Sequence, residues 1–114
     1  MSASRNKYGA KPVVVDGVRF ASKAEAKRDA ELRLLATKGE VIDIERQPKF
    51  DLKVNGKKVC RYVADWSYWE PDPRAEHRCL RFVVEDKKGV QTRDFKIKWN
   101  LAKALFPEIE WRLS

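Results

Sequence analysis

The sequence has little of what several common catalytic and structural sites require. His77 is the only histidine among the 114 residues, so a serine- or cysteine-type triad has one candidate base and no nucleophile pattern beside it. Cys60 and Cys79 are the only cysteines and form no CxxC pair, which argues against a structural zinc site. Any catalysis is therefore left to carboxylates, lysine and a metal ion.

Long apolar runs are also missing. No stretch approaches the roughly 18 apolar residues of a membrane span, and the N-terminal residues lack the apolar core of a signal peptide. We therefore expect a soluble cytoplasmic protein without a membrane partner, whose two cysteines are free thiols. The sequence has no internal repeat, low-complexity tract or linker, and its length predicts one domain spanning 1–114.

What the sequence has in excess is positive charge. Lys and Arg number 25 against 17 Asp and Glu, which gives a formal net charge of +8 and a pI near 9.7. This balance favours a polyanionic partner, most often nucleic acid. Arg5, Lys7 and Lys11 predict a flexible basic arm at about residues 1–11. The hydrophobic fraction of 43% is enough for a packed core in the rest of the chain.

Turn signals and periodicity predict a mixed α/β layout. Asp16-Gly17 and Asn55-Gly56 are two-residue hairpin signals. Helices are predicted from Ser22 to Gly39 and from Asp94 to Phe106. Strands are predicted at 12–15, 18–20, 58–68, 79–87 and 109–113. A further strand is predicted at 41–46, and after an interruption at Gln47-Pro48 it continues at 50–54. The order is a hairpin, a helix, three strands, a helix and a strand.

Each predicted helix has an apolar stripe. In the first helix the stripe consists of Ala26, Ala30 and Leu34, with Leu35 beside it. The polar side of that helix carries Lys23, Lys27, Asp29 and Arg33. In the second helix the period is set by Phe95, Lys98/Trp99 and Ala102.

Carboxylates interrupt apolar context at two places. Asp65 follows Tyr62-Val63-Ala64, and Glu85-Asp86 follows Phe82-Val83-Val84 and precedes Lys87-Lys88-Gly89. Acids at the ends of neighbouring buried strands are costly unless a cation lies between them, and Mg²⁺ binds to one or two carboxylates with waters and phosphate oxygens. A lysine two residues beyond such an acid lies on the same face, where it can stabilise phosphate charge or orient water.

Strand alternation selects between the two acid–lysine pairs. Leu80, Phe82, Val84, Asp86 and Lys88 share one face, which is apolar until it reaches the acid and the lysine. Cys79, Arg81, Val83, Glu85 and Lys87 share the other face, which already carries a charge in its middle. We therefore favour Asp86 and Lys88 as the site pair, a choice that a bulge would reverse.

These residues resemble the motif of the PD-(D/E)xK nuclease superfamily, with Ala64 in place of the proline that precedes the first Asp. Tyr62-Val63-Ala64-Asp65-Trp66 and Asp86-Lys87-Lys88-Gly89 look like the two motif pieces of small phage endonucleases of the endonuclease I type, which resolve Holliday junctions. The resemblance extends from about Asn6 to Leu113. The pieces Phe20-x-Ser22-x-x-Glu25, Gln47-Pro48-x-Phe50 and Pro107-x-Ile109 also look like an uncharacterised family of phage proteins with this nuclease core.

The resemblance implies an α/β fold with a mixed central sheet flanked by helices, the restriction-endonuclease-like core. It also implies a homodimer in the cytoplasm of a phage host that cleaves DNA, most often branched, with Mg²⁺ or substituting Mn²⁺. Asp65 and Asp86 would bind one or two ions with the backbone carbonyl of Lys87. Glu25, or else Glu85, would complete the ligand set, and Lys88 would position the water.

Each of these residues also has an ordinary structural interpretation. Ser22-x-x-Glu25 is a capping box. Asp65 can pair with Arg61 or Lys58, and Asp86-x-Lys88 before Gly89 is common turn chemistry. Candidate phosphate contacts are Lys23, Lys27, Arg93, Lys96 and Lys98, for which the alternative is a solvated helix face.

The aromatic residues Trp66, Tyr68 and Trp69 could stack on exposed bases, but core positions are favoured for them, as for Trp99 and Trp111. Two rival functions stay open. One is a DNA-binding recombination or packaging accessory that does not cut. The other is a nicking or restriction-type nuclease on the same core.

Overall fold

The computed structural model describes residues 11–75 and 79–114. In chain order the elements are β1 (Val13–Val15), β2 (Val18–Phe20), α1 (Lys23–Thr37), β3 (Ile42–Arg46), β4 (Lys49–Val54), β5 (Lys57–Val63), β6 (Trp66–Pro71), β7 (Leu80–Asp86), α2 (Arg93–Leu105) and β8 (Glu110–Leu113). Apart from Lys11, the expected basic arm lies outside the described residues, and so does His77.

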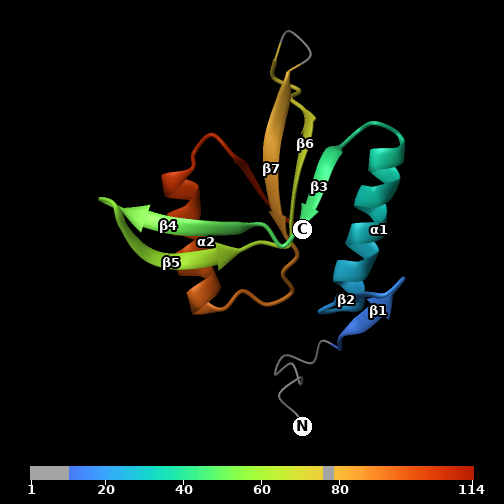
Figure 1. Cartoon of the computed structure of the whole chain (residues 1–114), viewed down its shortest axis with the longest axis horizontal. Helices are drawn as coiled ribbons and strands as arrows, with labels where there is room; N and C mark the ends of the chain where they lie inside the picture. The colour runs from blue at the N-terminus through green and yellow to red at the C-terminus, as the bar shows by residue number, and fades with distance from the viewer. Residues whose placement is uncertain (1–10, 76–78) are drawn as a thin grey trace.

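The predicted α/β class with a mixed sheet and two helices is confirmed. The central sheet has the order β3-β6-β7-β8, in which β7 and β8 are parallel and the other pairs antiparallel. Figure 1 shows this sheet nearly edge-on, with α1 on one side and α2 on the other. Neither helix has the length and apolar character that crossing a bilayer requires.

Two type I′ hairpins stand apart from the central sheet, and both turns were predicted. Asp16 and Gly17 have φ of 50° and 78°, and Asn55 and Gly56 have φ of 52° and 78°. Positive φ at both central positions is the requirement of this turn, which explains the Asp-Gly and Asn-Gly pairs. The first turn joins β1 to β2, and the second joins β4 to β5.

The single long strand predicted over 58–68 is wrong, because the chain bends at Ala64 and Asp65 between β5 and β6. The partner strand bends at the same level, where Gln47 has a φ of 54° and Pro48 has no N–H to donate. Gln47 N donates to Asp65 O at 2.9 Å, and Ala64 N donates to Pro48 O at 3.1 Å. The β4–β5 ribbon thus leaves the sheet and packs on α2 (Figure 1). Along the chain, five strands rather than the predicted three therefore lie between α1 and α2.

The first helix begins and ends close to its predicted limits, but its predicted apolar stripe is wrong. Leu34 is 56% exposed, whereas the buried residues of α1 are Glu25 and Leu32. Asp29, assigned to the polar side, accepts a hydrogen bond from Trp66 Nε1 at 2.9 Å. Charged residues on α1 therefore face the sheet, and apolar periodicity does not detect a face of this kind.

The sheet separates two apolar cores. One contains Leu32 and Val41 from the α1 side with Trp66, Tyr68 and Val83 of the sheet. The other contains the predicted stripe of α2, Phe95, Trp99 and Ala102, with Leu52, Tyr62, Ala64 and Val84, and Trp111 packs against it. The core positions predicted for Trp66, Tyr68 and Trp99 are confirmed, and Trp69 is 38% exposed. Cys60 and Cys79 are free thiols, as expected.

Candidate functional site

Asp65 lies at the corner where the β4–β5 ribbon leaves the central sheet. Its backbone oxygen accepts the bond from Gln47, so the corner is tied to the matching bend of the neighbouring strand. Its carboxylate Oδ2 accepts a hydrogen bond from Lys87 N at 2.8 Å. This second bond joins the corner to the residue that follows β7, and it brings Asp65 to the end of that strand.

Asp86 is the last residue of β7 and is 1% exposed. The Tyr62 hydroxyl donates a hydrogen bond to its Oδ2. Lys88 Nζ lies 3.5 Å from its Oδ1, and among the described residues this buried oxygen has no hydrogen-bond partner. Burial, and then the close approach and negative charge of Asp65, raise the pKa of Asp86 to about 7. The Asp65 carboxylate therefore lies close enough to act on the carboxyl group of Asp86.

Glu25 is the third acid at this corner. It lies in the first turn of α1, where its N–H donates to Ser22 Oγ at 3.1 Å. Its carboxylate Oε1 accepts from Arg46 Nη2 at 3.2 Å, so the Ser22 half of the capping box is present while the Glu25 side chain is directed to the sheet. Burial and the negative charge of Asp65 raise the pKa of Glu25, and Arg46 opposes the rise.

Lys88 contributes a cation next to the acids. Besides its 3.5 Å contact with Asp86, its ammonium lies 4.8 Å from the centre of the Phe95 ring. A hollow of about 360 Å³ opens beside it. This hollow is lined by Ala21, Ser22, Glu25, Asp65, Lys87, Lys88, Gly89, Val90, Thr92 and Phe95. Asp65 and the lysine thus face a space that a substrate group can enter.

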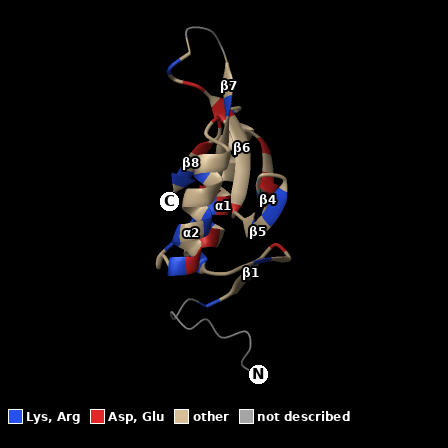
Figure 2. Cartoon of the chain, turned by 90° about the vertical axis from the view of Figure 1, so that its left-hand side faces the viewer, with Lys and Arg blue, Asp and Glu red and all other residues tan. Residues whose placement is uncertain are grey.

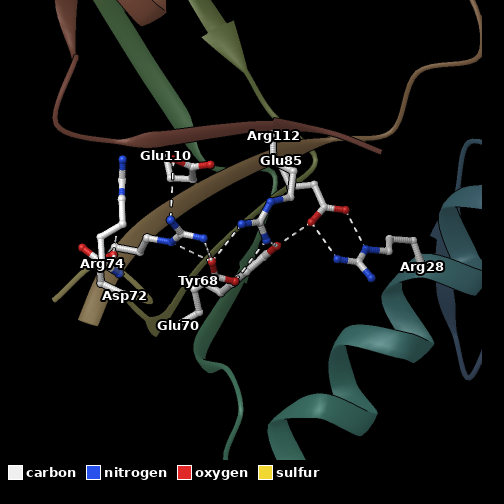
Figure 3. Close-up of polar contacts among 9 residues, drawn as sticks. Arg28, Tyr68, Glu70, Asp72, Arg74, Glu85, Glu110 and Arg112 are labelled. Atoms are coloured by element: carbon white, nitrogen blue, oxygen red, sulfur yellow. Dashed lines mark hydrogen bonds and ion pairs between the residues drawn. The ribbon is translucent and has the colours of Figure 1, made fainter. Parts of the chain in front are cut away.

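Glu85, one residue before Asp86, points to the other side of the sheet (Figure 3). Its carboxylate accepts two bonds from Arg28, from Nε at 2.6 Å and from Nη2 at 3.0 Å, and one from the Tyr68 hydroxyl at 2.5 Å. Burial would raise the pKa of Glu85, but the bonds from Arg28 and Tyr68 outweigh it and lower the pKa. The structure therefore brings Asp86 and Lys88 to Asp65, and it does not bring Glu85 there.

The contacts of Glu85 continue along the α1 side of the sheet. Arg112 Nη1 donates to the Tyr68 hydroxyl at 3.1 Å and to Glu70 Oε1 at 3.0 Å. Arg81 Nη2 lies 2.6 Å from Glu70 Oε2. The bonds from Arg112 and Arg81 lower the pKa of Glu70, although burial opposes them. On this side every acid of β6 and β7 has an arginine partner, whereas Asp65 and Asp86 share the single ammonium of Lys88, 3.5 Å from Asp86.

The comparison with protein families gives one match. The family described as "Protein of unknown function (DUF1064)" matches residues 5–114. The chain belongs to the DUF1064 family. The comparisons with curated proteins and with solved structures give no match.

The donor set of this DUF1064 protein fits a hard divalent cation. Within residues 11–75 and 79–114, no three His, Cys, Asp or Glu side chains are grouped so as to hold an ion by themselves. Mg²⁺ needs only one or two carboxylates, because waters and substrate phosphate oxygens complete its shell. Oδ1 of Asp86, which has no hydrogen-bond partner among the described residues, and the nearby carboxylate of Asp65 could supply two such ligands. The role predicted for the Lys87 carbonyl stays a prediction.

The phosphate contacts predicted for the DUF1064 protein lie on both helices. Lys23 and Lys27 of α1 are exposed, as are Arg93 and Lys96 of α2. Lys98 is half-buried and lines a hollow that Lys88 shares. Figure 2 shows basic residues along α2. DNA contact by these residues stays a prediction beside their interpretation as a solvated face.

Sequence reasoning missed the partners of the acids. Tyr62 was only part of a motif, yet its hydroxyl bonds to Asp86 across 24 positions of the chain. Arg46 and Arg28, which bond to Glu25 and Glu85, were not singled out at all. The one available signal was local: Tyr62 alternates with Ala64 on the buried face of its strand, so a hydroxyl there needs a buried partner.

Proposed function

We propose that this protein is a Mg²⁺-dependent DNA endonuclease that hydrolyses phosphodiester bonds, with branched DNA as its preferred substrate. One observation carries the proposal: Asp65 and Asp86, at the ends of neighbouring strands, bring two carboxylates together, and the buried Oδ1 of Asp86 has only the Lys88 ammonium at 3.5 Å and no hydrogen-bond partner among the described residues. Such a pair is costly without a cation, and costly arrangements of this kind are found at functional sites.

Asp65 and Asp86 would hold the ion, and Glu25 is close enough to Asp65 for their charges to interact. A bound Mg²⁺ would supply a Lewis acid for the phosphate and a more acidic water. Mn²⁺ has similar oxygen preferences and is expected to substitute. The hydrogen bond from Lys87 N fixes one oxygen of Asp65, and the bond from Tyr62 fixes one oxygen of Asp86. The second oxygen of each acid would then bind the ion, with the Lys88 ammonium beside that of Asp86.

The ammonium group of Lys88 lies beside the two acids, where phosphodiester hydrolysis would require a positive charge. Its ammonium, held between Asp86 and the face of Phe95, can stabilise the charge that develops on the phosphate or orient the attacking water. The order of the parts supports a PD-(D/E)xK core: an acid at the corner before β6, then an acid-x-Lys run at the end of β7, the strand that pairs with β6. Resolution of a junction needs two coordinated cuts, so we include a homodimer in the proposal.

Cleavage of a labelled four-way junction and of a matched duplex, with Mg²⁺ or with EDTA, tests the proposal. The variant is Asp65→Asn, and the matched control is Asp43→Asn. Asp43 is exposed and lies near the start of β3, whereas the end of β3 at Arg46 is the one beside the acids. Its φ of 55° also suits Asn. We expect junction cleavage that needs the metal, disappears with Asp65→Asn and persists with Asp43→Asn.

The rival functions give different results. Binding without nicking, equal for the wild type and Asp65→Asn, would identify a DNA-binding accessory and overturn the proposal. Equal cutting of duplex and junction would keep the chemistry and identify a nicking or restriction-type nuclease instead.

A further inference from the structure

A second hollow, of about 560 Å³, lies on the other side of the acids. Its lining consists of Pro12, Arg19, Phe20, Ala21, Glu25, Arg46, Gln47 and Asp65. Glu25 and Asp65 line both this hollow and the one beside Lys88. The two hollows therefore adjoin at Glu25 and Asp65, and we refer to them together as the groove; Asp86 is buried and lines neither hollow.

Positive charge flanks the acids at both ends of this groove. Lys87 and Lys88 line one end, and Arg19 and Arg46 line the other. Arg19 is exposed on β2, and it forms no ion pair with any described residue. Its cation is therefore available to a ligand.

Arg46 forms the fixed wall of the second hollow. Its guanidinium lies 4.3 Å from the centre of the Phe20 ring and bonds to Glu25. Its Nε is buried and has no hydrogen-bond partner among the described residues. Arg46 thus joins the β1–β2 hairpin to α1 and β3, and it holds the hairpin beside the acids.

We propose that the hollow at Arg19 and Arg46 binds a phosphate group of the DNA strand, next to the phosphate that is cleaved. A nucleic acid strand carries one negative charge per nucleotide, so a site of several acids repels it unless cations stand on either side. Arg19 is the contacting residue, and Arg46 is a positioning residue that keeps the hairpin and Glu25 in place. The proposal deepens the proposed function and rests on it. It also gives a role to the β1–β2 hairpin, which has no strand in the central sheet.

The test compares Arg19→Gln with Lys57→Gln, an exposed control beside the β4–β5 turn; Figure 1 shows this turn on the opposite side of the molecule from the β1–β2 hairpin. Affinity for a fluorescent four-way junction is measured in EDTA over a range of salt concentrations. We expect Arg19→Gln to weaken binding by about threefold to tenfold and to reduce the slope of log K against log salt by about one, with no dependence on base sequence. Lys57→Gln should change neither quantity.

Mn²⁺ affinity in the absence of DNA separates this subsite from the metal site. Arg19→Gln should bind Mn²⁺ as the wild type does, because the arginine is not a ligand. If Arg19→Gln and Lys57→Gln bind DNA equally while the wild type cleaves it, the subsite is overturned and the nuclease stands. If the Arg19 effect appears but no cleavage occurs with metal, the groove binds DNA and the proposed chemistry fails.

Discussion

Glu85 and Asp86 are neighbours on β7, and both are buried, at 0% and 1% exposure. Their surroundings differ completely. Glu85 receives three hydrogen bonds from Arg28 and Tyr68, and its pKa is lowered (Figure 3). Asp86 faces Asp65, and burial together with that second acid raises its pKa to about 7. Burial is common to both residues, so compensation of the charge is what separates them.

The difference distinguishes a buried acid that stabilises the fold from one that the proposed metal site requires. A buried carboxylate with complementary donors holds elements together, and removal of a partner is costly. A buried carboxylate that faces another acid destabilises the fold until a cation arrives. Glu85 therefore ties β7 to α1 through Arg28. Asp86 is retained at a cost to stability, which is the pattern expected of a ligand for an ion.

The largest expected effect is on catalysis, and it separates the two neighbours. Asp86→Asn should reduce metal-dependent cleavage by at least about 100-fold, because a proposed ligand and its charge are lost. Glu85→Gln should retain cleavage within about tenfold where it is folded. The measurement is the initial rate of cleavage of a junction substrate at 10 °C, a temperature chosen so that both variants are compared in their folded state. Equal losses in both variants would remove the distinction between the two acids.

The next largest effect is on the free energy of unfolding, where Glu85→Gln should have a larger effect than Asp86→Asn. Glu85→Gln leaves Arg28 without its anionic partner, and we expect a loss of about 2–3 kcal/mol in the free energy of unfolding, since Arg28 retains some contact with water. Asp86→Asn should leave this free energy unchanged or raise it in EDTA, because a buried charge is removed. Urea denaturation at pH 7 measures both. An Asp86→Asn protein less stable than Glu85→Gln would contradict the comparison.

The fold could be predicted where its signals are local. The Asp-Gly and Asn-Gly turns and the aromatic stripe of α2 are read from adjacent or helically spaced residues, and all three are confirmed. The bend at Ala64-Asp65 was missed because the alternation Tyr62, Ala64, Trp66 continues through it. Only the structure shows that the first two of these side chains enter one core and the third enters the other.

The same distinction applies to the site. Alternation along β7 separates Asp86 from Glu85, so this choice could be made from the sequence. The bond from Tyr62 to Asp86 joins different strands, and the contact of Arg28 with Glu85 joins residues 57 positions apart. No local pattern encodes contacts of this kind, because they arise from the folding of α1 and the β4–β5 corner onto β7.

A smaller effect is expected in the pH dependence of stability. An acid whose pKa is higher in the folded than in the unfolded protein releases its proton first in the unfolded state. Without metal, the wild type should therefore lose stability as pH rises from about 5 to about 7, and level off above that range. Asp86→Asn should show a flatter profile. Urea denaturation of both proteins in EDTA between pH 5 and pH 8 gives the measurement, and the difference between the two profiles isolates the contribution of Asp86, because Glu25, whose pKa is also raised, is present in both.

The smallest expected effect concerns Tyr62, whose hydroxyl donates a hydrogen bond to Asp86. Tyr62→Phe removes the hydroxyl that fixes Oδ2 and keeps the ring that packs against Phe95 and Trp99. Loss of such an orienting bond typically costs about tenfold in metal affinity, so Mn²⁺ binding followed by calorimetry should weaken by about that factor. Tyr68→Phe, which removes the equivalent hydroxyl from Glu85, is the matched control and should leave Mn²⁺ affinity unchanged. An equal loss in both variants would mean that the hydroxyls act through general packing. A loss confined to Tyr62→Phe would assign the ion to Asp86.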